Sequence, residues 1–171
     1  AMTYEQILSH PPGHGSRSGT RLVDHLDETA RRLVTIGRFD TESHTVSERV
    51  ASATGYLHDF GKVTPEFQAY LRNSYTGPTQ RRYHARISAF AGFWVARQLG
   101  ATDRDTLAAF VAIARHHGRL PDLIEYLIER VADAESSDEV HNYATQQVAS
   151  IDAETSETAE TILDVAADGS G

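Results

Sequence analysis

The sequence predicts an all-α fold, and three observations carry that prediction. Apolar residues recur at intervals of three and four through most of the chain, which is the spacing of a helix buried on one side. Glycine and proline interrupt these stretches where short connections between helices are expected. No segment shows the alternation typical of a strand, and we find no internal repeat. With 171 residues, 40% of them apolar, the chain is expected to form one domain with its own core.

Helix-end signals divide the chain into successive elements after a loop at residues 9–20, which holds four glycine or proline residues in its first seven positions. Thr20 can cap the first helix, and Thr64 precedes Pro65, a proline at a first helical position. The expected helices span 22–36, 47–60, 66–71, 84–99, 103–118 and 121–131, with weaker patterns at 138–151 and 156–167.

Charge is distributed unevenly along the chain, whose formal net charge is −8. Residues 131–171 hold ten acids and no lysine or arginine, which leaves 14 of the 24 acids and all 16 bases in residues 1–130, a formal +2. We therefore expect a core at 1–130 that can accept an anionic substrate. Residues 131–171 are expected to be an acidic helical tail that packs loosely or at the periphery and contributes little to a site.

Composition excludes several classes of protein. There is no cysteine, so disulfides and thiolate metal sites are excluded, and any metal must use nitrogen and oxygen ligands. No apolar stretch reaches the roughly 18 residues of a membrane span, and we expect no signal peptide. A cytoplasmic protein without a membrane partner is expected.

The nine histidines fall into two sets. Four lie in loops or beside weak helices, where we expect them to be solvated: His10, His14, His44 and His141. Five lie in or beside strong helices: His25, His58, His84, His116 and His117. Each of the five alone is more simply explained as a structural residue. Together with Asp59 they make six nitrogen and oxygen ligands at helix ends, which a bundle can bring to one pole, and six ligands suit two cations about 3.5–4 Å apart.

The segment from Tyr56 to Lys62 carries the densest chemistry. His58 and Asp59 both suit a divalent cation, and the two oxygens of an aspartate can bridge two cations. Gly61 is expected to end the helix in a left-handed turn, which leaves Lys62 just beyond it. Lys62 is the only lysine in the chain.

These elements resemble the motif set of the HD phosphohydrolase superfamily, and more narrowly the HD nuclease module of the CRISPR interference helicase-nuclease of type I systems. The resemblance covers roughly residues 8–125 and rests on order and spacing. Its elements are Ser9-His10-Pro11-Pro12, Leu22-Val23-Asp24-His25-Leu26, His58-Asp59-Phe60-Gly61-Lys62, Phe67-Gln68-x-x-Leu71, Tyr83-His84-Ala85 and Ala114-Arg115-His116-His117-Gly118-x-Leu120.

The resemblance implies an HD-domain helical bundle with the metal site at helix ends and a metal-dependent nuclease that acts on single-stranded DNA in antiviral defence. Two divalent ions are implied, drawn from Mn, Ni, Co, Fe or Mg, with Asp59 bridging them and the five helix-associated histidines completing the set. The family also has a late aspartate downstream of the double histidine. Asp164 or Asp168 could fill that role here, but the resemblance favours a tail at 131–171 that is truncated relative to the full HD domain. The implied partners are a helicase domain, in cis or in trans, and the CRISPR surveillance complex.

Catalysis is assigned to Asp59 and Lys62. Lys62 is expected just outside the ligand ring, where its ammonium would pair with the scissile phosphate. Arginines that flank the ligand-bearing segments are expected to track the strand's backbone: Arg81, Arg82, Arg86, Arg115 and Arg119. Tyr75 or Tyr83 is a weaker candidate for stacking on a base.

Two alternatives stay open beside the nuclease. One is a nucleotide phosphohydrolase or phosphodiesterase of the wider HD superfamily that acts on small molecules. The other is a degenerate HD module that only binds a partner. The early ligands and Lys62 are all retained, which argues against the second alternative, and the arginines of the loop at 72–83 favour a polymeric substrate over a nucleotide.

Overall fold

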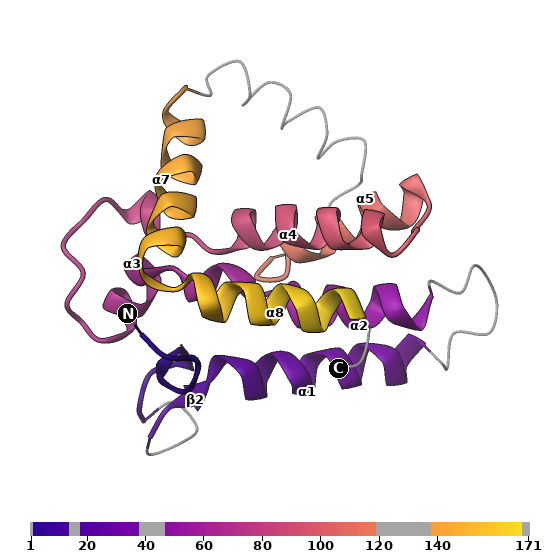
Figure 1. Ribbon diagram of the computed structural model, residues 1–171, viewed down its shortest axis with the longest axis horizontal. Helices are drawn as coiled ribbons and strands as arrows, with labels where there is room; N and C mark the ends of the chain where they lie inside the picture. Colours follow the sequence, from indigo (N-terminus) through magenta and orange to yellow (C-terminus); the bar gives the residue numbers. More distant parts are fainter. Residues whose placement is uncertain (1, 14–17, 38–46, 119–137, 169–171) are drawn as a thin grey trace.

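A computed structural model describes residues 2–13, 18–37, 47–118 and 138–168, and it confirms the all-α prediction (Figure 1). The elements in chain order are η1 (Tyr4–Gln6), β1 (Leu8–His10), β2 (Thr20–Arg21), α1 (Leu22–Gly37), α2 (Glu48–Leu57), η2 (Phe60–Val63), α3 (Pro65–Leu71), η3 (Thr79–Arg82), α4 (Ala85–Gln98), α5 (Asp103–Ala114), α7 (Asp138–Glu154) and α8 (Ser156–Asp168), where η marks a 3-10 helix. None of the described helices is long and apolar enough to cross a membrane.

Helix α2 is the central element of the bundle. It packs against α1 on one side and contacts α4, α5 and α8 on the others. In Figure 1 these helices run side by side across the view, whereas α7 stands nearly at right angles to them beside α3 and η3. The residues that follow α2 therefore emerge where several helix ends meet.

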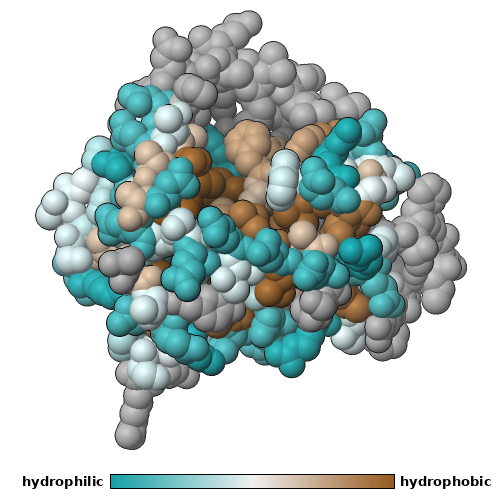
Figure 2. All heavy atoms as spheres, in the orientation of Figure 1, coloured by the Kyte–Doolittle hydropathy of each residue, from teal (hydrophilic) through white to brown (hydrophobic). Residues whose placement is uncertain are grey.

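The main core includes the N-terminal segment and the C-terminal helix as well as the central bundle. Ile7, Leu26 and Leu57 are fully buried in it, as is Ile162 of α8. Figure 2 shows apolar side chains across the middle of the face on which α4 and α8 lie, with hydrophilic ones below them. The core is thus one cluster that connects sequence positions more than 150 residues apart.

The expectation that the acidic tail packs loosely or at the periphery is wrong for α8. Ala159, Ile162 and Ala166 are at most 4% exposed and belong to the main core. Their spacing of three and four residues places them on one stripe of the helix, and their small size lets the helix approach closely. The acids of this segment lie on the opposite side, as the exposed Asp164 and Asp168 show.

A short two-stranded antiparallel sheet corrects the prediction of a plain loop at 9–20. Leu8 pairs with Arg21 and His10 with Thr20. Strands of three and two residues are too short to display an alternating pattern in the sequence. The buried amide of Gln68 holds β1 from the other side: it accepts a hydrogen bond from the Leu8 N–H at 3.0 Å and donates to the Leu8 carbonyl at 2.7 Å.

Some predicted features lie outside the described residues. They are His14, His44, Arg119 and the expected helix at 121–131. His141 lies on α7, but its side chain is not among those described.

Candidate metal centre

The chain leaves α2 earlier than expected, and this turns Asp59 into the bundle. Helix α2 ends at Leu57, and Asp59 has φ −114° and ψ 15° before the 3-10 turn of η2. Gly61 lies in that turn and is not left-handed, so the predicted role as a helix stop is wrong. A Cβ atom at Gly61 would collide with the backbone carbonyl of His84 and with the side chain of Ile87. Glycine is needed here because the start of α4 presses against η2.

Two histidine rings are oriented by backbone carbonyls one turn earlier. The Nδ1 atom of His58 lies 2.7 Å from the Gly55 carbonyl oxygen, and Nδ1 of His116 lies 2.6 Å from that of Ile113. A carbonyl can only accept, so each Nδ1 carries the proton. Both Nε2 atoms face Asp59, where a protonated ring would donate a hydrogen bond and a neutral ring would present a lone pair.

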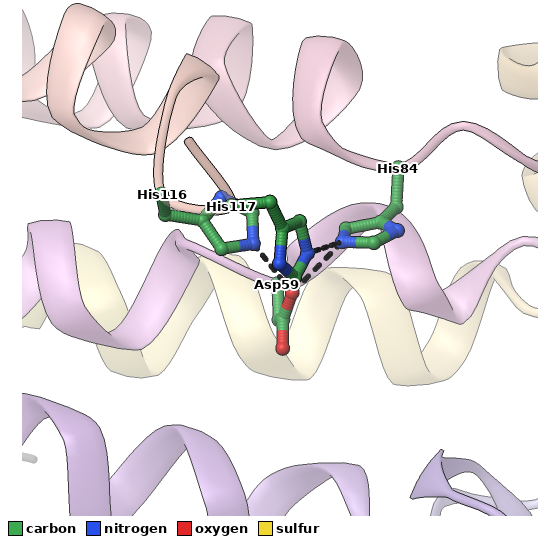
Figure 3. A group of neighbouring side chains, drawn as sticks. All are labelled: Asp59, His84, His116 and His117. Carbon is green, nitrogen blue, oxygen red and sulfur yellow. Dashed lines mark hydrogen bonds and ion pairs between the residues drawn. The ribbon is translucent and has the colours of Figure 1, made fainter. Parts of the chain in front are cut away.

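The two carboxylate oxygens of Asp59 face different histidines. Oδ2 lies 3.0 Å from Nε2 of His25 and 3.3 Å from Nε2 of His58. Oδ1 lies 3.0 Å from Nε2 of His84 and 3.2 Å from Nε2 of His116. Figure 3 shows His84 approaching from the segment before α4 and His116 and His117 from the end of α5, with Asp59 between them.

Electrostatics keep the carboxylate ionised. Asp59 is 2% exposed, and burial on its own would raise its pKa. Hydrogen bonds with the four surrounding imidazoles outweigh burial and hold the pKa of Asp59 well below its usual value. Burial lowers the pKa of His84, and burial together with repulsion from His116 and His84 lowers the pKa of His117 to about 4. At neutral pH these two rings are neutral, the form that binds metal.

These residues form two groups that fit divalent cations. One contains His25, His58 and Asp59, and the other contains Asp59, His84, His116 and His117; within each group the ligand atoms lie within 4.8 Å of one another. If His58 and His116 are neutral, their Nε2 lone pairs point at an ionised carboxylate, which is repulsive unless a positive charge lies between them. Protonating all five rings would instead crowd like charges, since His84 and His117 Nε2 are 3.0 Å apart. Cations satisfy both groups at once.

Comparison with known proteins agrees with this geometry. The family model described as "Cas3, HD domain" matches residues 17–169. The chain belongs to this family. A curated relative from Haloferax volcanii, named "CRISPR-associated nuclease/helicase Cas3", is 39% identical over a 140-residue alignment that covers 78% of this chain. The chain spans 15% of that relative's length. No solved structure matches this chain.

Lys62 lies inside the centre, which corrects the expectation that it sits just outside the ligand ring. Its side chain is 5% exposed, and Nζ lies 2.7 Å from Oδ2 of Asp59. Nζ also donates to the carbonyl and the hydroxyl of Ser9, at 3.3 and 3.4 Å. Because the ammonium is already engaged by protein oxygens, the expected contact with a substrate phosphate has no support in its surroundings.

Three residues of the centre's surroundings were not assigned a role from the sequence: Ser9, His10 and Gln68. The ring of His10, which was expected to be solvated, lies edge-on to that of His25 with centroids 5.3 Å apart. Gln68 donates to the Lys62 carbonyl at 2.8 Å while it clamps β1. The sequence motifs contain these three residues, but their roles became clear only from the packing of β1 against η2.

The arginines expected at the substrate differ in their surroundings. Arg81 forms a salt bridge with the buried Glu66, and the guanidinium of Arg82 lies 4.1 Å from the ring centroid of Tyr70. Arg86 is exposed at the start of α4, and Arg115 is half-buried at the end of α5. Asp164 and Asp168, the candidates for the late aspartate, are exposed and belong to neither ligand group.

Proposed function

We propose that this chain is a metal-dependent nuclease that hydrolyses single-stranded DNA in CRISPR interference. The observation that supports this most directly is that the two oxygens of Asp59 face separate sets of imidazoles, at 3.0–3.3 Å. A carboxylate in that position can bridge two divalent cations. The imidazole-rich donor set favours Fe, Co and Ni over Mg and Mn.

The residues of the two ligand groups would hold separate cations, and Lys62 would have a different role. His25, His58 and Oδ2 of Asp59 would hold one cation; His84, His116, His117 and Oδ1 would hold the other. Two such cations neutralise charge on the phosphoryl oxygens and supply an activated water. Lys62 would act as a positioning residue, because its ammonium holds Oδ2 of the buried carboxylate at 2.7 Å.

The charge around the centre supports a polymeric substrate over a free nucleotide. Residues 72–86 contain four arginines and no acidic residue, although the chain as a whole carries a formal charge of −8. A local basic segment of this kind suits a chain of phosphates. Arg82 and Arg115 are the residues we assign to the strand's backbone. Arg81 is assigned to support of η3, because Glu66 already neutralises it.

A metal-dependent cleavage assay tests the proposal. Protein stripped with EDTA is supplied with each of Mn, Ni, Co, Fe and Mg and offered a labelled single strand, a duplex and a panel of nucleotides. We expect cleavage of the single strand that requires metal, and none by Asp59→Asn. Hydrolysis of nucleotides without strand cleavage would favour the wider HD phosphohydrolases instead. No hydrolysis with any metal would favour a module that only binds a partner.

The wider setting also belongs to the proposal. We expect the chain to act in the cytoplasm with a helicase, in cis or in trans, that delivers single-stranded DNA released at the CRISPR surveillance complex. The relative's name joins nuclease and helicase in one protein, which supports a helicase partner. Adding a helicase and ATP to the purified chain should convert a resistant duplex into a substrate.

A further inference from the structure

We propose that Tyr70, Arg82 and Tyr83 form a platform on which unpaired bases stack as a strand enters the metal centre. This inference rests on the proposed function and names a base-binding subsite for it. The ligand is an unpaired nucleobase of a nucleic-acid strand, read by its π-face and not by its hydrogen-bonding edge.

A continuous series of rings leads outward from the metal centre to Tyr70. The ring of Phe67 lies 4.9 Å from that of His84, edge to face, and the ring of Tyr70 lies 5.9 Å from that of Phe67. Phe67 is buried, whereas Tyr70 is 44% exposed. The guanidinium of Arg82 covers Tyr70 at 4.1 Å from the ring centroid. The Arg82–Tyr70 pair is thus a planar, partly open surface two ring contacts from a metal-ligating histidine.

Tyr83 places a second aromatic ring directly before His84. It is 60% exposed, and no ring contact or side-chain hydrogen bond engages it within residues 2–13, 18–37, 47–118 and 138–168. Its backbone is held on both sides: its N–H donates to the Gln80 carbonyl at 3.2 Å, and its carbonyl accepts from Nε2 of Gln147 at 2.9 Å. Gln147 is 3% exposed and donates also to the Arg81 carbonyl at 2.7 Å.

A fixed backbone with an unused aromatic ring suits binding. The backbone of this segment is already ordered in the free protein, so little further conformational entropy is lost when a base stacks on the ring. Without a ligand, holding an exposed tyrosine in one position would contribute little to the stability of the fold. Gln147 lies on α7, so these hydrogen bonds link the acidic C-terminal helix to the backbone of the segment that carries Tyr83 and His84.

The charge of the same segment fits the backbone that would carry these bases. Arg72, Arg82 and Arg86 lie within 72–86, a stretch without an acidic residue, whereas Arg81 of the same stretch is neutralised by Glu66. Arg86 is exposed in the first turn of α4. The planar guanidinium of Arg82 can attract phosphate while one of its faces lies on the ring of Tyr70. Alternating aromatic rings and cations is the arrangement by which proteins bind single strands without sequence preference.

The test compares strands with and without bases. Fluorescence anisotropy measures the Kd of a labelled oligo-dT and of an abasic strand of the same length, in EDTA so that neither is cleaved. We expect Tyr83→Ala to raise the Kd for oligo-dT roughly 5- to 100-fold and to leave the Kd for the abasic strand unchanged. Tyr70→Leu keeps an apolar contact with Phe67 and should show the same dependence on bases.

Trp94→Ala is the matched control, because Trp94 is a 54% exposed aromatic residue on α4. It lies ten residues beyond His84, about 15 Å along the helix, and should leave both Kd values unchanged. Equal Kd values of Tyr83→Ala and wild type for oligo-dT would overturn the platform, as would an equal loss on both strands. If wild-type protein cleaves DNA while this result is found, the proposed function stands without the platform. If wild type neither binds nor cleaves either strand, the proposed function fails and the platform with it.

Discussion

The two ligand groups that share Asp59 differ in the charge that already lies beside each carboxylate oxygen. Oδ2, on the side of His25 and His58, also receives the ammonium of Lys62 at 2.7 Å. Oδ1, on the side of His84 and His116, has no ammonium beside it within the described parts of the chain. The Oδ1 side also has a third imidazole, His117, which is exposed.

This difference leads us to expect that the two ligand groups would not bind cations equally. A cation on the Oδ2 side must share its oxygen with a positive charge, whereas a cation on the Oδ1 side meets three imidazoles and an unshared oxygen. We therefore expect the group with His84, His116 and His117 to bind first and more tightly. Its exposed His117 also makes it the side from which solvent and substrate can approach.

Loss of Asp59 should abolish the difference in metal affinity between the two ligand groups, because Asp59 is a member of both. Asp59→Asn is expected to remove both metal-binding events in calorimetry and to slow strand cleavage by at least about 10³-fold, the scale of losing a preorganised electrostatic group. It also leaves the buried Lys62 ammonium unpaired, which should cost about 3 kcal/mol of unfolding free energy.

The double variant Asp59→Asn/Lys62→Met separates these two effects. It removes the unpaired charge and should recover most of the stability in urea unfolding without recovering cleavage. Near-normal cleavage by Asp59→Asn, in protein free of contaminating nuclease, would remove Asp59 from the bridging role.

Truncation of one imidazole on each side tests the order of binding. His116→Ala should weaken the tighter calorimetric event by roughly 10²-fold or more, since it removes a direct ligand where loss of a supporting contact already costs about 10- to 100-fold. His25→Ala should leave that event in place and affect only the weaker one. The reverse pattern would show that Lys62 does not weaken binding at Oδ2.

Removal of Lys62 should reduce the difference in metal affinity between the two ligand groups. Lys62→Met is expected to strengthen the weaker metal-binding event, because the competing charge at Oδ2 is gone, and to lower turnover by about 10²-fold because Asp59 loses a positioning contact. Lys62→Arg should restore turnover only in part, since a planar guanidinium fits poorly in a site shaped for an ammonium. Unchanged metal affinity together with lower turnover would instead support a contact between Lys62 and substrate.

The smallest effect is expected from the pH dependence of the metal-free protein. The folded-state pKa of His117 is about 4, below the ordinary value of 6.5, so the unfolded chain binds a proton that the folded chain does not. Stability should therefore fall as the pH drops from 6.5 toward 4, with a contribution from His84, whose pKa is also lowered. The urea midpoint of His117→Gln should change less between pH 7 and 5 than that of wild type. Equal changes would mean that His117 stays solvated in the absence of metal.

Local pattern predicted much of this fold and site. Helical spacing in the chain located the helices that the structure contains, and the cap at Thr64 is observed, with its hydroxyl accepting from the Phe67 N–H. The prediction that His58 and Asp59 lie close to His84 or His116 is confirmed, because Asp59 belongs both to the group with His58 and to the group with His84 and His116. Histidines placed at helix ends meet in a bundle because helix ends gather at its poles.

Sequence patterns failed where the answer depended on contacts between distant segments. Gly61 was expected to be left-handed, but its conformation and its need to be glycine come from the start of α4 pressing on it. The tail was expected to be peripheral because its acids are conspicuous, yet three small or branched residues on one stripe of α8 enter the core.

The identity of the candidate metal ligands was therefore decided by the sequence, because an imidazole or a carboxylate has the same ligand chemistry wherever the chain places it. Which carboxylate oxygen each imidazole faces was decided by tertiary structure, and so was the burial of Lys62 between Asp59 and Ser9. The physical reason is that these orientations depend on η2, β1 and α4 packing together. Their direction is set by close contacts between residues up to 57 positions apart, which no local periodicity records.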